Sequence, residues 1–315
     1  MDFVARDGGG GRSPRAGLLA IWVLGALLAG CSPHSSKPAV VEDSLTSGRI
    51  TLVCAWEARA VIERERDAFQ SLYPQVQIEI QAGTSREAIG RLFGGTADVA
   101  VIARELAPEE RAAAQRGRLE LEGYRFAHDA LLAVVHPSVG VENLTLADLE
   151  SIYAGRAQRW SEFGGDGTRI VPVVQPQESD VTQCFVQRVM PGGAIAARSV
   201  EATSDSEVVA EVSARPGAIG YVSLGAALGN LHALRLASLR GLPYRDADLE
   251  RVYRGEYPLT RFFNLYVRAS SRPAANGFIT YITSIDGQKL VQQSGYVPTA
   301  VPVRFVRRSP LRGTH

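Results

Sequence analysis

Short apolar runs alternate with amphipathic segments along most of the chain from residue 49 onward. Residues 50–54 and 99–102 are continuous apolar runs typical of buried strands, and apolar residues alternate with polar ones over 76–80. Between these runs the apolar residues recur at helical spacing, which predicts one helix ending before Pro74 and another near Phe93. This β-α-β-α-β order predicts an α/β sheet with helices on both faces.

A second series of elements follows from about residue 131. Thr145 with Asp148 and Ser204 with Glu207 have the spacing of helix N-terminal caps. Two packed α/β lobes are the simplest arrangement of this many elements. The predicted strands lie at 131–135, 170–174, 218–222 and 262–267, and the predicted helices lie near 146–153, 181–189, 208–212, 278–282 and 290–291.

The first thirty residues have the pattern of a secretion signal. Arg6, Arg12 and Arg15 precede a fifteen-residue apolar stretch at 16–30, which ends in small residues before Cys31. The junction resembles the bacterial lipoprotein signal, in which the cysteine is lipidated and becomes the first residue. A short membrane anchor is the alternative, although the stretch is below the ~20 residues that a spanning helix needs.

Residues 31–48 are rich in Ser and Pro and lack periodicity, so they are expected to tether the lipid to the folded part. The protein is therefore expected outside the cytoplasm, as a lipoprotein of the cell envelope held at a membrane. The chain has 315 residues, with 34 basic and 33 acidic side chains and a net charge of +1. This balance argues against a nucleic-acid partner, which would favour a strong basic excess.

The sequence lacks the common signatures of catalysis. It contains no Gly-x-Ser-x-Gly, no His-Glu-x-x-His and no phosphate-binding Gly-x-x-x-x-Gly-Lys loop, and its five histidines are scattered. We therefore expect no enzyme, no metal and no cofactor. An enzyme would need an acid and a base within reach of each other in one cleft.

Five segments resemble a known family when they are taken together and in order. They are GGTADVAVIAREL at 94–106, LTLADLESIYAGRAQRW at 144–160, GAIGYV at 217–222, YPLTR at 257–261, and DGQKL followed by GYVP within 286–298. The chain resembles the substrate-binding proteins of phosphate-type ABC importers, which have the type II periplasmic-binding-protein fold.

The resemblance implies a two-lobe α/β fold of mixed sheets flanked by helices, with a hinge between the lobes. Residues 49–134 and 258–308 would form lobe one, and residues 135–257 would form lobe two. The ligand would be a small anion, phosphate by resemblance, bound between the lobes at helix N-termini and passed to an ABC permease.

Matching the family's four ligand loops to this chain, one position at a time, gives a set of expected ligand contacts. Tyr221, in the GAIGYV segment, is expected to be structural. The expected contacts are Ala55, Trp56, Thr84, Ser85, Arg104, Gln175, Ser179, Asp180, Val181 and Thr182.

The fourth loop departs from the family pattern. Gln175 stands where the family has an anion-clamping arginine, Val181 replaces a hydroxyl residue, and Glu178 and Asp180 add negative charge. A charge-assisted hydrogen bond contributes roughly 1.5–3 kcal/mol, so these losses would weaken phosphate binding by orders of magnitude. The alternative function is a divergent binding module that has lost phosphate and acts as a sensor or docking protein.

Several further positions leave alternatives open. Arg86 or Thr182 could replace the lost contacts if the loops align differently. Cys54 and Cys184 are either buried thiols or a disulfide that locks the lobes, since they fall on opposite sides of the expected cleft. Trp56 either stacks on an organic ligand or packs in lobe one. Ala103 stands where the family has Ser or Asp.

Overall fold

The structure, a computed structural model, describes residues 42–195 and 198–299. The predicted signal peptide at 1–30, the lipidation site Cys31 and most of the predicted tether lie outside the described residues. Among the described residues there is no helix of the length and apolarity that crossing a bilayer would need.

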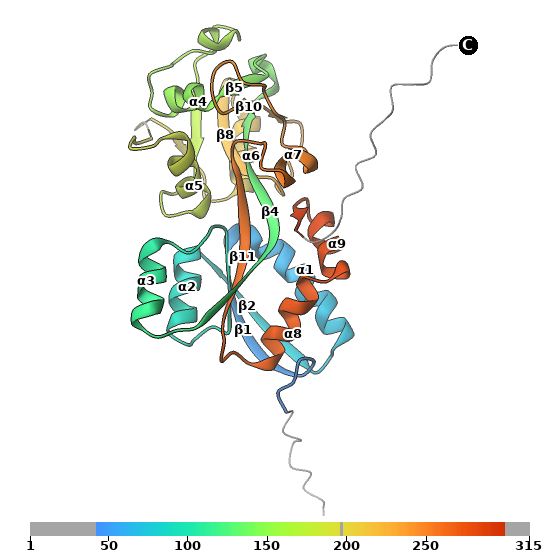
Figure 1. The fold of residues 1–315 in the computed structure, drawn as a ribbon. Coiled ribbons are helices and arrows are strands. Elements are labelled where there is room, and N and C mark those ends of the chain that lie inside the picture. Colours follow the sequence, from blue (N-terminus) through green and yellow to red (C-terminus); the bar gives the residue numbers. More distant parts are fainter. Residues whose placement is uncertain (1–41, 196–197, 300–315) are drawn as a thin grey trace, which may run out of the picture. The chain divides into compact units, whose positions relative to one another are not determined.

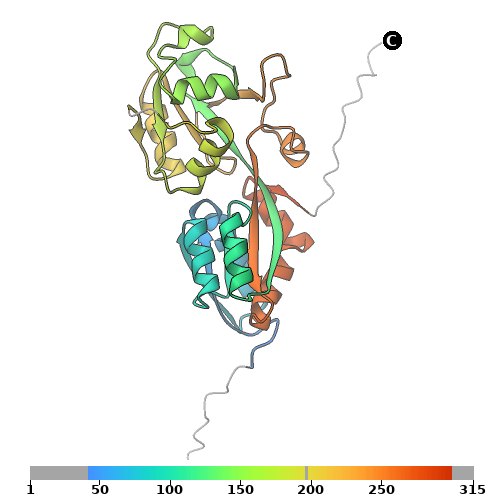
Figure 2. The same cartoon turned by 60° about the vertical axis from the view of Figure 1, so that its left-hand side comes forward.

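One group of elements is built on three parallel strands, with β1 paired to β2 on one side and to β3 on the other. Apolar residues of α1, α8 and α9 pack on one face of these strands, and those of α2 pack on the other. Figures 1 and 2 show these helices on opposite sides of the strands. We call this group the first lobe. Its elements are β1 (Gly48–Ala55), α1 (Arg59–Leu72), β2 (Val76–Gly83), α2 (Ser85–Phe93), β3 (Val99–Ile102), α3 (Pro108–Arg116), α8 (Pro273–Ile282) and α9 (Ile285–Gln293).

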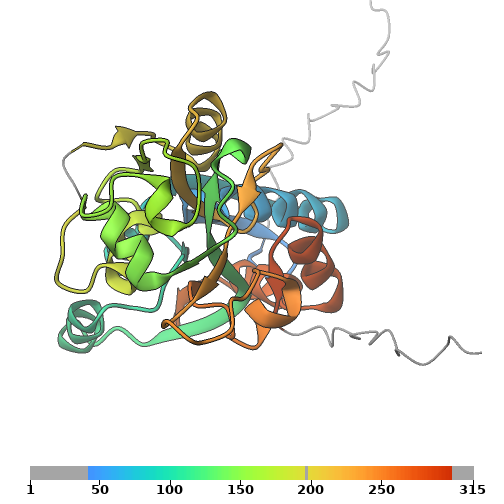
Figure 3. The same cartoon turned by 90° about the horizontal axis from the view of Figure 1, so that it is seen from above.

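Helices distant in sequence lie side by side in the first lobe. Arg64 of α1 donates hydrogen bonds to the carbonyl oxygen of Gln293 and to the hydroxyl of Ser294, at the end of α9. Figure 3 shows α1 in blue beside the red C-terminal helices. The C-terminal part of the chain therefore completes the lobe that the N-terminal part begins.

The elements from the middle of the chain pack around a second apolar cluster. At its centre the rings of Phe185 and Tyr221 stack with centroids 4.2 Å apart, and Tyr153 packs edge-on against Phe185 at 4.6 Å. We call this group the second lobe. Its elements are β5 (Asn143–Thr145), α4 (Leu146–Tyr153), β6 (Val171–Val174), α5 (Asp180–Val189), β7 (Val200–Glu201), α6 (Asp205–Ala214), β8 (Ala218–Ser223), β9 (His232–Ala233), β10 (Arg235–Ala237) and α7 (Leu249–Tyr253).

Two antiparallel strands join the lobes. β4 (Leu121–Val135) pairs with β11 (Thr260–Arg268) along its first part and with β8 along its last five residues. The short strand β12 (Val297–Pro298) also pairs with β4. The strand order is therefore continuous, β2-β1-β3-β11-β4-β8-β6-β7. Figure 1 shows β4 and β11 running together from one lobe to the other.

The predicted α/β class, with mixed strands flanked by helices, is confirmed. The strand predicted at 99–102 has those bounds, and both predicted capping pairs form. The lobe boundaries stay a prediction, although residues 130–134, which were assigned to lobe one, pack in the second cluster. Strand β4 begins ten residues before the predicted strand, and α3 was not predicted.

Candidate functional site

The N-terminus of α2 is closed by its own side chains. The hydroxyl of Thr84 accepts a hydrogen bond from the N–H of Glu87, and the Glu87 carboxylate accepts from the N–H of Thr84 at 2.7 Å. This is a capping box, which satisfies two of the free donors of the first turn. Thr84 is therefore committed to its helix, and it is not among the residues lining the two hollows described below.

Ser85 connects the two lobes. Its side chain is fully buried, and its hydroxyl accepts a hydrogen bond from the N–H of Ala103 at 3.0 Å. The N–H of Ser85 donates to Oδ2 of Asp180 at 2.7 Å, and Asp180 is the first residue of α5 in the second lobe. A carboxylate of the chain thus sits at the helix N-terminus, a position that favours negative charge.

Arg104 is held mainly by a residue of its own lobe. Its guanidinium makes two bonds to the carboxylate of Glu110, at 2.7 and 2.8 Å, and lies 4.0 Å from Oδ1 of Asp180. The hydrogen bond to Glu110 raises the pKa of Arg104. Much of its charge is therefore already compensated before any ligand arrives.

The fourth loop is tied into the second lobe. Ser179 caps α5 by accepting from the N–H of Thr182. The Thr182 hydroxyl donates to the carbonyl of Gln175 at 3.0 Å and lies 2.8 Å from the hydroxyl of Tyr221. The amide of Gln175 donates to Asp205 at 2.7 Å. These groups hold the loop in place, and Tyr221 acts structurally, as expected.

A first hollow, of about 380 Å³, opens between the lobes on one side of Asp180. We call it the acid hollow, because Glu57 of the first lobe and Asp180 and Asp205 of the second line it, with no arginine or lysine among its lining residues. Burial raises the pKa of Glu57, opposed by Arg261, and burial also raises the pKa of Asp205. Hydroxyls of Ser179, Thr203, Ser204 and Ser206 complete its polar wall.

A second hollow, of about 460 Å³, lies on the other side of Asp180 and is also lined from both lobes. We call it the arginine hollow, since six arginines line it against three carboxylates, those of Glu105, Glu109 and Asp180. The arginines are Arg86, Arg104, Arg111, Arg125, Arg188 and Arg261.

A buried ion pair on the crossing strands lies beside the arginine hollow, and no sequence motif predicted it. Nε of Arg261 lies 2.7 Å from Oδ2 of Asp129, its cross-strand partner, and Nη2 donates to Ser223 at 2.8 Å. Nη1 of Arg261 lies 3.6 Å from Oε1 of Glu57. The YPLTR segment contained Arg261, but nothing local connected it to Asp129, 132 residues away.

The predicted contacts therefore divide into two groups. The acid hollow is lined by Trp56, Gln175, Ser179 and Asp180, and the arginine hollow by Arg104 and Asp180. The side chains of Ala55, Ser85, Val181 and Thr182 are buried, and none of these residues lines either hollow. Trp56 is 58% exposed, which does not fit the packing alternative.

Cys54 and Cys184 are free thiols in this structure, so the disulfide alternative is not realised here. Cys54 is buried in the core of the first lobe, and burial raises its pKa to about 12. Burial also raises the pKa of Cys184, which lines the arginine hollow. Burial therefore disfavours the thiolate form of both cysteines. Among the described residues no cluster of metal-ligating side chains occurs.

The comparisons with known proteins agree with this arrangement. The family model for a PBP superfamily domain matches residues 46–286. The phosphate-binding protein PstS of Bacillus subtilis is 25% identical over 274 residues, covering 86% of this chain and 87% of that protein. The PstS protein of Pseudomonas aeruginosa PAO1 is 25% identical over 297 residues, covering 89% and 92%.

Solved structures show the same fold. A Clostridium perfringens protein with bound phosphate has a TM-score of 0.71 at 24% identity, covering 80% of this chain and 99% of that one. An ABC-type phosphate transport receptor from Vibrio cholerae has a TM-score of 0.68 at 23% identity, covering 79% and 99%. The relatives are named for binding, and the expectation of a binding protein instead of an enzyme is confirmed. The chain belongs to the PBP superfamily, as its five motifs indicated.

Proposed function

We propose that this chain is an extracytoplasmic substrate-binding protein of a phosphate-type ABC importer, which binds phosphate or a related small anion between its lobes. The supporting observation is that both lobes contribute arginines to one hollow, at the end of the first lobe where α2 begins. Arginine forks match the geometry of phosphoryl oxygens, so such a hollow suits an anion. The full-length relatives named PstS support the same ligand.

Calorimetry of the domain without residues 1–30 tests this proposal. Phosphate, sulfate and a phosphonate are titrated at low ionic strength, with chloride at the same ionic strength as the control. We expect submillimolar binding of phosphate. An absence of heat with every oxyanion would contradict the proposal.

The second candidate, a divergent module that has lost phosphate binding, is favoured by one specific contact. The Asp180 carboxylate accepts from the Ser85 N–H at the N-terminus of α2, where the family resemblance led us to expect the ligand. Glu57 and Asp205 add two more acidic groups nearby. If this second function holds, the protein binds no oxyanion and serves as a sensor or a docking protein.

We further propose that the chain is held at the membrane by a lipid on Cys31 and delivers its ligand to an ABC permease. The charged start, the apolar stretch and the small residues before Cys31 support the lipid. Full-length wild-type protein expressed in bacteria should partition with the membrane fraction. Cys31→Ser should remain unprocessed and unlipidated, as measured by mass spectrometry, and equal masses for the two chains would contradict the proposal.

A further inference from the structure

Three features make the arginine hollow unlike a site for a single small anion. It is about 460 Å³, much larger than one tetrahedral oxyanion, and its guanidiniums come from several elements. Six arginines face three carboxylates, so its wall carries a positive excess. A cleft lined by one sign of charge concentrates ions of the other sign.

The arginines of this hollow differ in how far they are already neutralised. Arg104 is paired with Glu110, Arg125 with Glu105, and Arg261 with Asp129. In contrast, the guanidiniums of Arg86, Arg111 and Arg188 make no ion pair or hydrogen bond with another residue of the described ranges. Three cations without a direct ion pair among the described residues thus remain around one hollow, and Arg86 acts on the Glu110 carboxylate only at longer range.

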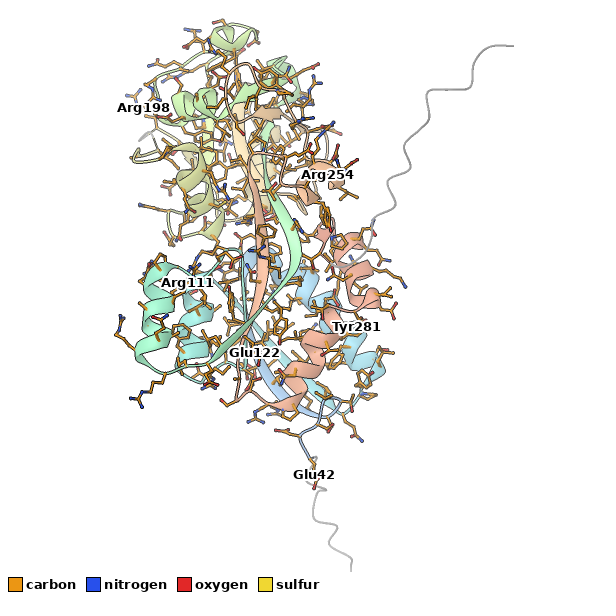
Figure 4. All side chains as sticks on the ribbon, in the orientation of Figure 1. Glu42, Arg111, Glu122, Arg198, Arg254 and Tyr281 are labelled. Carbon is orange, nitrogen blue, oxygen red and sulfur yellow. The ribbon has the colours of Figure 1, made fainter. Side chains whose placement is uncertain are left out.

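These three arginines come from both lobes. Arg86 is on α2 and Arg111 on α3 of the first lobe, and Arg188 is on α5 of the second. Figure 4 labels Arg111 at the end of α3 that faces α5. A ligand that reaches all three must carry several anionic groups spaced along its length, since one phosphate offers charge at a single point.

The N-terminus of α2 and the acid hollow suit an anion less well than the arginine hollow does. The N-terminus of α2 already holds the Asp180 carboxylate, and the acid hollow has carboxylates but no arginine or lysine in its wall. An anion entering between the lobes is therefore directed to the arginine hollow. Leu106, Pro108 and Phe262 also line this hollow, so its wall offers apolar surface to an uncharged part of a ligand.

We propose that the arginine hollow binds an anion with two or more linked phosphoryl groups, held between Arg86, Arg111 and Arg188. The inference rests on the proposed function, from which it takes an anionic ligand bound between the lobes. The shared chemistry is a condensed phosphate chain, whether inorganic or carried on an organic ester. Orthophosphate then binds the same arginines more weakly, because it cannot reach them all.

Calorimetry with inorganic triphosphate, adenosine triphosphate and orthophosphate tests the inference. We expect inorganic triphosphate to bind at least tenfold more tightly than orthophosphate. Tighter binding of adenosine triphosphate than of the inorganic chain would identify an organic ester as the source, and equal or weaker binding would identify the inorganic chain. Both results support a site for linked phosphoryl groups.

Substitutions on one helix provide the matched control. Arg111→Gln and Arg116→Gln remove the same charge from α3, but only Arg111 lines the hollow, and both side chains are exposed, so folding should persist. We expect Arg111→Gln, Arg86→Gln and Arg188→Gln each to weaken triphosphate binding about tenfold, and Arg116→Gln to change it less than twofold. Equal effects of Arg111→Gln and Arg116→Gln would overturn the inference.

The two proposals fail in different ways. If orthophosphate binds as tightly as triphosphate, the inference is overturned and the proposed function stands. If triphosphate binds but orthophosphate does not, the inference is supported and phosphate is contradicted as the small ligand. If no oxyanion binds, both are overturned and the second candidate function remains.

Discussion

The two hollows on either side of Asp180 have similar positions and opposite chemistry. Each is lined from both lobes, and each lies where strands of the first lobe end and helices begin. One is lined by Glu57, Asp180 and Asp205, and the other by six arginines. The fold therefore provides the place for a ligand, whereas a few loop and first-turn residues decide which charge that ligand carries.

The two hollows differ in how far the charges of their acidic and basic side chains are neutralised. In the acid hollow burial raises the pKa of Glu57 to about 7, so this carboxyl is only partly ionised at neutral pH, and burial also raises the pKa of Asp205. Arginines keep their charge at any ordinary pH, and partners neutralise only some of them in the other hollow.

The largest expected effect comes from the buried ion pair of Arg261, which lines the arginine hollow, with Asp129. Asp129→Asn leaves the buried Arg261 guanidinium, 4% exposed, without its main counter-charge. Breaking a buried pair from one side costs about 3–5 kcal/mol, so we expect a loss of about 3 kcal/mol in the free energy of unfolding. Urea denaturation measures this. The exposed Asp286→Asn is the control, and an equal loss in both variants would contradict the prediction.

Asp180→Asn removes the carboxylate that the two hollows share. The uncharged side chain no longer repels an anion in the arginine hollow, so we expect triphosphate to bind about tenfold more tightly. The amide hydrogen of Ser85 should also exchange faster, because its charge-assisted hydrogen bond becomes a neutral one. Calorimetry and hydrogen exchange measure the two effects. Unchanged values for both, relative to Asp286→Asn, would mean that the Asp180 carboxylate neither repels an anion in the arginine hollow nor strengthens the Ser85 hydrogen bond.

The protonation of Glu57 in the acid hollow should appear in the pH dependence of the free energy of unfolding. Because burial raises its pKa in the folded chain above 4.5, the unfolded chain releases this proton first as the pH rises. Wild type should therefore lose stability relative to Glu57→Gln between about pH 4.5 and the folded-state pKa of about 7, by about 2–3 kcal/mol. Urea denaturation across this range measures the difference. A gain in wild type would show that the attraction of Arg261 outweighs burial.

The smallest effect is expected at Trp56, which is exposed at the edge of the acid hollow. If ligands enter the arginine hollow, Trp56→Phe should change triphosphate affinity less than twofold. Calorimetry of this variant beside wild type measures the change. A loss of tenfold would favour stacking of an organic ligand on the indole and would place the ligand in the acid hollow.

The elements that the sequence predicted best are those whose signal is local. The helix caps of Thr145 and Ser204 involve residues three positions apart, and Val99–Ile102 is a bounded apolar run. Helix α3 was missed because Ala114 is its one buried residue, so it carries no apolar stripe. The first part of β4 was missed because residues 121–125 are largely exposed and are held by backbone pairing with β11.

The candidate site was predicted only in part. The ligand loops stay a prediction of the resemblance, and of the expected contacts Asp180, Arg104, Gln175 and Ser179 line one or both hollows. It did not show that Glu110 pairs with Arg104, because this depends on the unpredicted α3. Arg86 was noted only as a replacement contact, and Arg111 and Arg188 carried no motif.

The sequence by itself determined the α/β class and the family, since apolar periodicity and short motifs are encoded by neighbouring residues. Only the tertiary structure decided the charge of each hollow. Asp180 meets Ser85 across 95 residues and Arg261 meets Asp129 across 132, so no local pattern could show which charges are neutralised. Electrostatic compensation acts through space, and it exists only once the chain has folded.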